Sequence, residues 1–340
     1  MKNDTKNILV QRLKENDPAK VSALFAEADA VRREYMGDCV YLRGIIEFSN
    51  ICARDCHYCG LRASNAKLSR YTLSRKEIME SVAVAKEFEI GTVVLQAGEG
   101  SPVPIKELCS IVTEISGMGM AVTLSAGELP FDDYKALREA GADRYLLKFE
   151  TSNEKLYKKF RPWSELKDRL ECIENLKKLG FQAGSGNLVG FPGQTDEDLA
   201  DDILLCKELE LDMVSISVFL PHPETPLKGV KKPALEKMLK TLALARIVTL
   251  NTHMPATTAA GTMDPLGREK ALQCGANVIM PNVSPAEFRK LYEIYPDKIC
   301  TNEGTRDCYP CLTRRIESVG RTVGKGRGDS VRKGLTEKSK

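Results

Sequence analysis

Short apolar runs rich in β-branched residues recur along the chain, and amphipathic segments of helical period separate them. Eight of these runs have the length and composition of buried strands. They are Val40–Phe48, Thr92–Gln96, Ala121–Ser125, Arg144–Lys148, Gln182–Val189, Met213–Leu220, Met254–Thr257 and Asn277–Met280. The predicted helices between them are Ser74–Phe88, Pro104–Met118, Asp132–Ala140, Ser164–Leu179, Glu197–Leu209 and Lys232–Leu250. This alternation predicts a parallel sheet built from repeated βα units.

Start and stop signals support several of these helices. Ser74 stands three residues before Glu77, which is the spacing of a capping box, and apolar residues follow from Ile78. Thr195 precedes a run of carboxylates, which favour a helix N-terminus. Glycines stand where predicted helices should end, at Gly91, Gly119, Gly141, Gly180 and Gly275.

Polar residues follow the predicted strands at their C-terminal ends. Cysteines follow the first strand, Gln96 to Glu99 the second, Ser125 to Glu128 the third and Lys148 to Thr151 the fourth. In a barrel these ends meet at one face, where barrel enzymes carry their active sites. We therefore predict an α/β fold, a complete (β/α)8 TIM barrel with N-terminal and C-terminal helical additions. A doubly wound open sheet is the structural alternative.

The chain divides into three parts on this interpretation. Residues 1–38 are expected to form helices packed on the barrel, residues 39–320 the barrel itself, and residues 321–340 a basic, disordered tail. The tail holds seven Lys and Arg against Asp329 and Glu337, so it carries +5, and the net charge of +3 leaves residues 1–320 at about −2. The body is therefore not a basic surface, and we expect no nucleic-acid partner.

Targeting signals are not evident in the sequence. The first residues, Met1 to Lys6, lack an apolar core, and no run approaches the ~20 apolar residues that span a bilayer. We expect a cytoplasmic protein without a membrane partner. Eleven cysteines, an odd number, then argue for reduced thiols and ligands over disulfides.

Three of these cysteines, Cys52, Cys56 and Cys59, stand directly after the first predicted strand. Soft thiolates select iron–sulfur clusters, zinc or copper(I), and no fourth ligand follows at the usual short spacing. Three thiolates on a 4Fe-4S cube leave one iron open to a bound molecule, and we predict such a cluster here. A partial zinc knuckle or chance clustering is the alternative.

Further polar residues at strand ends are candidate ligand-binding groups. Gly98 allows a close backbone approach, and Glu99 offers a carboxylate to an ammonium group. Glu150 could hold ribose hydroxyls, and Arg169 could pair with a carboxylate, although most such residues form surface ion pairs. The glycine-rich stretch from Gly184 does not match a dinucleotide fingerprint, because Val189 stands where a third glycine is needed.

A second group of cysteines lies near the C-terminus, at Cys300, Cys308 and Cys311. Their spacing could hold a second iron–sulfur cluster with an incomplete ligand set. Free thiols are an equally good interpretation of the spacing alone.

Several longer stretches resemble the biotin-synthase-like group of radical S-adenosylmethionine (SAM) enzymes, and within it the HydE family of FeFe-hydrogenase maturases. The resemblance runs from about Val31 to Gly320. Its clearest stretches are Ile45–Asn50, Tyr58–Arg62, Val94–Glu99, Gly141–Leu147, Gly190–Thr195, Pro221–Leu227, Pro255–Ala259 and Gly275–Asn282. The resemblance implies a reduced cluster that cleaves SAM to methionine and a 5′-deoxyadenosyl radical. In that family the radical acts on a small iron–carbonyl–cyanide–cysteine complex.

The same resemblance implies the site residues. The catalytic cluster ligands are Cys52, Cys56 and Cys59, and the C-terminal cysteines match a second cluster site found in part of the family. The implied SAM-binding residues are Tyr58, Gly98, Glu99, Ser125, Glu150, Arg169, Leu188 and Met213. The implied substrate residues are Gln96, Thr123, Lys148, Thr257, Thr258 and Tyr292. A reductant such as ferredoxin or flavodoxin and hydrogenase maturation partners are implied as well.

One departure from the family pattern concerns the substrate. The family carries Arg-His-Glu after the fourth strand, whereas this chain has Lys148, Phe149 and Glu150. Lysine keeps the charge and loses the planar fork of arginine. A paralogue, or an enzyme like methylornithine synthase that acts on an amino acid, is therefore the first alternative. An iron–sulfur carrier or scaffold is the non-enzyme alternative.

Overall fold

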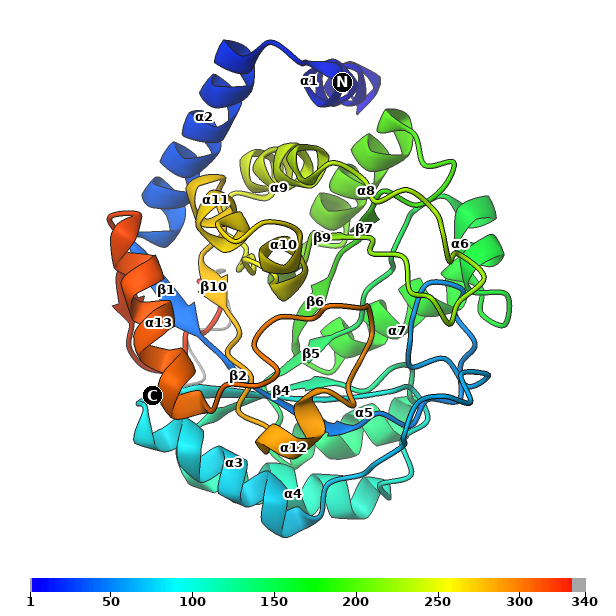
Figure 1. Cartoon of the computed structure of the whole chain (residues 1–340), viewed down its shortest axis with the longest axis vertical. Helices are drawn as coiled ribbons and strands as arrows, with labels where there is room; N and C mark the ends of the chain where they lie inside the picture. The colour runs from blue at the N-terminus through cyan, green and yellow to red at the C-terminus, as the bar shows by residue number, and fades with distance from the viewer. Residues whose placement is uncertain (1, 332–340) are drawn as a thin grey trace.

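A parallel sheet of six strands forms the centre of the molecule (Figure 1), in the computed structural model that describes residues 2–331. The strand order is β2-β3-β4-β5-β6-β8, and each neighbouring pair is parallel. The strands are β2 (Gly44–Ser49), β3 (Thr92–Ala97), β4 (Ala121–Ser125), β5 (Arg144–Leu146), β6 (Gln182–Ser185) and β8 (Met213–Val214). The order never reverses, whereas a doubly wound sheet reverses at a switch point. The doubly wound alternative is therefore wrong.

Helices that connect these strands lie around the outside of the sheet (Figure 1). They are α3 (Arg75–Glu87), α4 (Ile105–Gly117), α5 (Phe131–Glu139), α6 (Glu154–Phe160), α7 (Leu166–Lys178), α8 (Asp196–Glu208) and α9 (Leu235–Thr249). In α4 the residues Leu108, Ile111, Val112 and Ile115 are buried, which is the spacing of one helix face. They join Val93, Leu95, Val122 and Leu124 of the strands in one hydrophobic core. The apolar positions that alternate between predicted strands and helices are therefore the positions that these elements bury against each other.

The first two helices, α1 (Lys2–Lys14) and α2 (Pro18–Met36), cover α8 and α9. Asp17 caps α2 by accepting hydrogen bonds from the backbone N–H groups of Ala19 and Lys20, at 2.9 and 3.1 Å. Leu9 and Leu13 of α1 and Leu24 of α2 are buried in the main core. The N-terminal helices are thus continuous with the core of the central fold.

The stretch after residue 320 corrects one prediction. The sequence predicts a disordered tail from residue 321, but β11 (Thr322–Gly324) pairs in parallel with β1 (Cys39–Leu42). Further on, Asp329 accepts a hydrogen bond of 2.5 Å from the buried Arg144. The composition of the tail lacks any periodicity, so these partners, distant in sequence, were not predictable from it. The rest of the predicted tail, residues 332–340, lies outside the described residues.

The sequence predicts a closed barrel of eight strands, and only part of this barrel consists of regular strands. Three predicted runs each divide into two short strands: β1 and β2, β6 and β7 (Leu188–Val189), and β8 and β9 (Ser217–Val218). The run Met254–Thr257 contributes only an isolated parallel bridge from Pro255 to Val278 of β10 (Val278–Ile279), and the preceding residue, His253, forms another to Met213. A further parallel bridge joins Asn282 to Ile45 of β2. The six-stranded sheet is therefore accompanied by a three-stranded sheet, β10-β1-β11, and the pair β7-β9.

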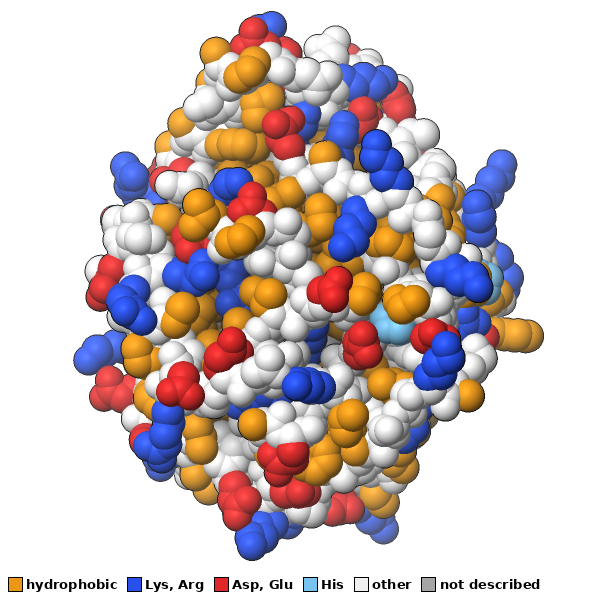
Figure 2. Space-filling view, viewed as in Figure 1, with side chains coloured by type: hydrophobic (Ala, Val, Ile, Leu, Met, Phe, Trp, Pro, Cys, Tyr) orange, Lys and Arg blue, Asp and Glu red, His pale blue; other side chains and the backbone are white. Residues whose placement is uncertain are grey.

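Four further helices follow α9 in the described chain. They are α10 (Thr258–Met263), α11 (Gly267–Gln273), α12 (Ala286–Arg289) and α13 (Thr305–Ser318). The connection between α12 and α13 crosses in front of the strands in Figure 1. Among the described helices, none has both the length and the apolar character needed to cross a membrane. Lys and Arg side chains are interspersed with Asp and Glu over the face shown in Figure 2.

Candidate active site

A cavity of about 320 Å³ lies where the C-terminal ends of the central strands meet the cysteine loop. Most of the residues predicted from the sequence line it together. They are Cys52, Cys56, Tyr58, Cys59, Gln96, Gly98, Glu99, Ser125, Lys148, Glu150, Arg169, Leu188, Thr257, Thr258 and Tyr292. Residues more than 200 positions apart in sequence therefore line one partly open cavity.

The cysteine loop is held by backbone hydrogen bonds to three different segments. Ala53 N–H donates to the Glu99 carbonyl at 2.8 Å, His57 N–H to Phe160 at 2.9 Å, and Gly60 N–H to Ile294 at 3.0 Å. Gly98 makes this arrangement sterically feasible. A Cβ at position 98 would lie 2.2 Å from the Ile51 carbonyl oxygen. The loop position thus depends on contacts from beyond the motif.

The three thiols suit an iron–sulfur cluster. All of them are free, and burial raises the pKa of the Cys56 thiol to about 11, against the opposing charge of Arg161. Burial also raises the pKa of Cys59. Buried thiolates of this kind need a cationic metal centre for stability. Within residues 2–331, no three His, Cys, Asp or Glu side chains converge closely enough for a single metal ion.

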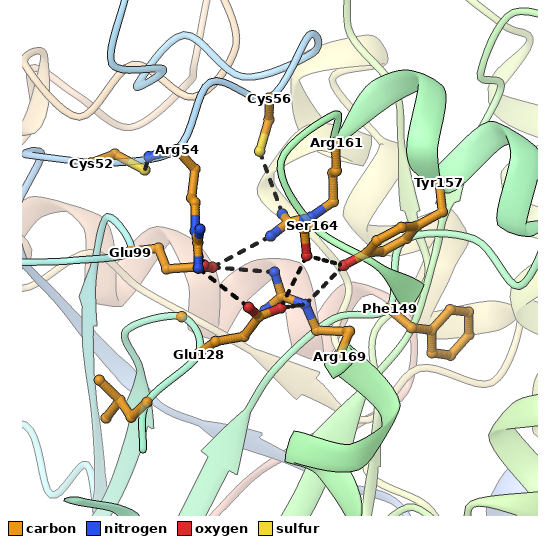
Figure 3. Close-up of polar contacts among 12 residues, drawn as sticks. Cys52, Arg54, Cys56, Glu99, Glu128, Phe149, Tyr157, Arg161, Ser164 and Arg169 are labelled. Atoms are coloured by element: carbon orange, nitrogen blue, oxygen red, sulfur yellow. Dashed lines mark hydrogen bonds and ion pairs between the residues drawn. The ribbon is translucent and has the colours of Figure 1, made fainter. Parts of the chain in front are cut away.

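Beside the loop lies a network of arginines and carboxylates (Figure 3). Glu99 forms ion pairs with Arg54, with Arg161 at 3.4 Å and with Arg169 at 3.2 Å. The second carboxylate, Glu128, lies 2.8 Å from Arg169 and 3.4 Å from Arg54. Three cationic and two anionic groups are therefore concentrated here, and together they could bind the ammonium and carboxylate of an amino acid.

The two carboxylates of this network do not have the same environment. Burial raises the pKa of Glu128, and the nearby negative charge of Glu99 raises it further. Arg161 and Arg54 oppose this shift. The pKa of Glu128 still lies above its ordinary value, because burial disfavours its charged form most strongly and the charge of Glu99 adds to this effect.

Glu150 has an unusual backbone conformation for its residue type. Its φ is +65°, in the left-handed region that non-glycine residues rarely adopt. Its Oε2 lies 3.1 Å from Lys148 Nζ, yet this buried oxygen accepts no well-aligned hydrogen bond from any described residue. Strain of this kind is concentrated at functional sites. A hydroxyl group bound in the cavity could satisfy that oxygen.

Three residues of the predicted site region lie away from the cavity wall. Thr123 is in β4, where its buried Oγ1 has no hydrogen-bond partner within the described chain. Met213 is in β8, and its sulfur lies 2.8 Å from Arg43 Nη1. Phe149 is completely buried in the core. The replacement of a polar residue at position 149 therefore does not alter the lining of the cavity, which corrects that part of the sequence interpretation.

The C-terminal cysteines form a separate group. Cys308 and Cys311 lie in α13, while Cys300 precedes the helix and has a φ of +61°. The hydrogen bond from Cys308 and the charge of Arg268, 3.7 Å from the Cys300 sulfur, lower the pKa of Cys300. None of the three lines the cavity. Their chemistry is therefore physically separate from the first cysteine loop.

Five charged residues of this site are not among the site residues predicted from the sequence. Arg54 lies inside the cysteine motif, and Glu128 follows the third strand, so their positions were already conspicuous. Arg161 follows the short helix α6, which was not predicted, and no local signal marks it. Glu47 and Lys298 also line the cavity as an ion pair.

Comparisons with known proteins agree with this geometry. Residues 46–206 match the model of the radical SAM superfamily. The [FeFe] hydrogenase maturase subunit HydE of Thermotoga maritima is 48% identical over 328 residues, covering 96% of this chain and 94% of that protein. A 3-methylornithine synthase of Methanosarcina acetivorans is 29% identical over 276 residues, covering 79% of this chain and 77% of that protein.

Solved structures show the same fold. The structure of methylornithine synthase (PylB) has a TM-score of 0.84 at 24% identity, with 94% of each chain covered. The HydG maturase of Carboxydothermus hydrogenoformans has a TM-score of 0.71 at 20% identity, covering 92% of this chain and 84% of that one. Enzymes of this superfamily use a 4Fe-4S cluster and SAM. The chain belongs to the radical SAM superfamily of enzymes, in the branch that contains the hydrogenase maturase HydE.

Proposed function

We propose that this enzyme cleaves SAM reductively in the maturation of FeFe hydrogenase, acting on a small iron–cysteine complex as HydE does. The observation that supports this most is the shared cavity, in which the cysteine loop faces the Glu99 network. The near full-length similarity to HydE supports the same substrate class.

The roles of individual residues follow from their chemistry. Cys52, Cys56 and Cys59 would hold the cluster, which supplies the electron for SAM cleavage. Glu99 accepts the ammonium of SAM, Arg169 pairs with its carboxylate, and Glu150 accepts a ribose hydroxyl. The other SAM contacts are assigned to Tyr58, Gly98, Ser125 and Leu188, whereas Met213 is left out because it lies away from the cavity wall.

The remainder of the cavity is assigned to the substrate. Gln96, Thr257 and Thr258 offer hydrogen-bonding groups, and Tyr292 closes the wall beside them. Thr123 is the nearby buried hydroxyl with an unused hydrogen-bonding capacity. Lys148 gives this half a positive charge. A partly enclosed cavity of this kind reduces the access of solvent to a radical and so limits side reactions.

We infer that the fold is a complete (β/α)8 barrel formed by residues 39–320, with residues 1–38 packed on it. The bridges His253–Met213, Pro255–Val278 and Asn282–Ile45 support closure between β8 and β2. The cytoplasm, a ferredoxin or flavodoxin reductant and hydrogenase maturation partners belong to the same proposal. A second cluster at Cys300, Cys308 and Cys311 is included as an accessory site.

Anaerobic reconstitution tests the first half of the proposal. Protein reconstituted with iron and sulfide, then given dithionite and SAM, should release 5′-deoxyadenosine. Absence of that product with an intact cluster would contradict the SAM-cleaving role. Restoration of active FeFe hydrogenase in a strain lacking HydE tests the second half.

A methylornithine synthase-like activity is the second candidate. Lys148 in place of arginine favours it, as does the similarity of the PylB fold over the full chain. Conversion of lysine by the reconstituted enzyme, combined with failure to restore hydrogenase, would establish this alternative. A protein that only carries or assembles iron–sulfur clusters would not need the strained Glu150 and the charged network that share the cavity with the cysteines.

A further inference from the structure

Arg161 connects the cysteine loop with the charged network beside it. Its Nη1 donates to the Cys56 sulfur at 3.4 Å and to the Tyr58 hydroxyl at 3.3 Å. Its Nη2 donates to Glu99 Oε2 at 3.4 Å. One guanidinium therefore contacts a cluster ligand and the carboxylate assigned to the SAM ammonium at the same time, as Figure 3 shows.

The backbone at Arg161 is anchored by hydrogen bonds, and its side chain is buried. The Arg161 N–H donates to the Tyr157 carbonyl at 2.8 Å, and the preceding residue, Phe160, accepts the His57 N–H of the cysteine loop at 2.9 Å. The guanidinium carbon lies 5.6 Å from the centre of the Tyr157 ring, and the side chain is only 8% exposed. The backbone of Arg161 is therefore tied to the cysteine loop, and its buried guanidinium lies between Cys56 and Glu99.

Hydrogen bonds and positive charge at a ligand sulfur set the potential of an iron–sulfur cluster. A donor beside a thiolate stabilises the reduced, more negative form. The Arg161 charge is shared with Glu99, which lowers its effect on Cys56. A ligand ammonium that pairs with Glu99 neutralises part of this competing charge.

We propose that Arg161 is a positioning residue that couples SAM binding at Glu99 to the reduction potential of the cluster. The inference rests on the SAM-binding role proposed for Glu99. SAM raises the potential because the arginine then acts more fully on the Cys56 sulfur. By linkage, SAM binds the reduced protein more tightly than the oxidised protein by the same factor.

Redox titration of the reconstituted protein, monitored by the electron paramagnetic resonance of the reduced cluster, tests this coupling with and without SAM. In Arg161→Gln we expect the equilibrium constant for reduction to fall about tenfold, which is 59 mV for one electron. The SAM-induced rise should be smaller than in the wild type. Arg161→Lys should keep most of the potential without SAM and still show the smaller rise, because one ammonium cannot contact both partners.

Lys158→Gln is the matched control. It removes a positive charge from the same helix, and its exposed side chain pairs only with Glu165 among the contacts described. Its potential and SAM response should equal those of the wild type. Iron and sulfide content are measured for every protein, so that only filled sites are compared.

An Arg161→Gln protein with full cluster content and the wild-type SAM response would overturn the proposal. If Arg161→Gln does not retain the cluster, Arg161→Lys provides the test. A wild-type SAM response in Arg161→Lys would likewise overturn the proposal. The titration uses no substrate. Failure of this inference is therefore distinguishable from failure of the proposed maturation function.

Discussion

At the scale of single residues, close backbone approach determines what position 98 can hold. Gly98 N–H donates to the Ser49 carbonyl at 3.1 Å, so the end of β3 lies directly against the start of the cysteine loop. A side chain there would meet both the Ile51 carbonyl and the Cys52 Cβ. Glycine is the residue that permits this contact.

Replacement of Gly98 by alanine should therefore lower cluster content severalfold. Its Cβ would lie 2.2 Å from the Ile51 oxygen and 2.7 Å from the Cys52 Cβ, so the backbone of the loop must move. Iron and sulfide per chain after reconstitution measure the effect. Gly117→Ala is the control, since nothing lies within 4 Å of a Cβ there. Wild-type iron content in Gly98→Ala would contradict the steric argument.

Lys148 and Phe149, which depart from the family pattern, differ in their effect on the cavity. Lys148 lies on the cavity wall and pairs with Glu150 at 3.1 Å. Phe149 points into the core and leaves the cavity unaffected. Two adjacent substitutions can differ in this way because successive residues of an extended segment point to opposite sides.

At the scale of elements, long periodic helices were predicted well and interrupted strands poorly. The predicted bounds of α3 and α4 are within one residue of those observed, and β4 matches fully. The run Gln182–Val189 breaks at Gly186, where a Cβ would lie 2.1 Å from the Ser215 carbonyl oxygen. Helix α13 belongs to the predicted C-terminal helical addition, for which no bounds were predicted, and it contains Pro310, which normally argues against a helix interior.

The capping box of α3 offers a test at this scale. Ser74 Oγ accepts from Glu77 N–H at 3.3 Å, and Ser74 N–H donates to the Glu77 carboxylate at 2.6 Å. Ser74→Ala should lower the free energy of unfolding by about 1 kcal/mol. Urea-induced unfolding measures this loss, and SAM cleavage should be unchanged.

Lys76→Ala in the same helical turn is the control for that measurement. Lys76 is 84% exposed, so the change in unfolding free energy should stay within about 0.5 kcal/mol. An equal effect of the two substitutions would show that the cap contributes nothing specific.

At the scale of the whole molecule, the C-terminal segment supplies charges and acceptors that the central strands require. Arg144 of β5 is fully buried, and its guanidinium donates to Thr92, to the Arg327 carbonyl and to Asp329. Gln182 also donates to Asp329, at 3.0 Å. Without this segment, a buried charge would lack its partner, which is strongly unfavourable.

Asp329→Asn should destabilise the protein at neutral pH and reduce its sensitivity to acid. Burial raises the pKa of Asp329, but Arg144 and the hydrogen bond from Gln182 outweigh this and keep the pKa below its ordinary value. A depressed folded-state pKa contributes stability above the unfolded value of about 4, and this stability is lost as the pH falls through the folded-state pKa. The melting temperature measured between pH 7 and pH 3 should therefore fall less in the variant than in the wild type.

Lys325→Ala is the control for that series, because Lys325 is 87% exposed and its nearest described ion-pair partner is 3.8 Å away. It should follow the wild-type curve. An Asp329→Asn protein with the same acid sensitivity as the wild type would contradict the role assigned to this carboxylate.

The two cysteine groups lie in different parts of the molecule, so substitutions in the two groups should differ in their effect on SAM cleavage. Cys56→Ala should abolish 5′-deoxyadenosine formation, because Cys56 lines the cavity. Cys308→Ala should leave most of that activity, since Cys308 lies in α13 outside it. Product yield per reconstituted 4Fe-4S cluster is the measurement. Equal loss in both variants would place the second group in the catalytic machinery.

The sequence by itself determined the βα alternation and the cysteine loop, because periodicity and motif spacing are local properties, and the family resemblance added further residues that line the cavity. Only the tertiary structure decided the partners of Arg161, the location of Phe149 in the core and the docking of residues 322–330. These depend on contacts between segments far apart in the chain. The partner of a buried charge or of a close backbone contact is set by the three-dimensional arrangement of the chain, so a local sequence pattern does not predict it.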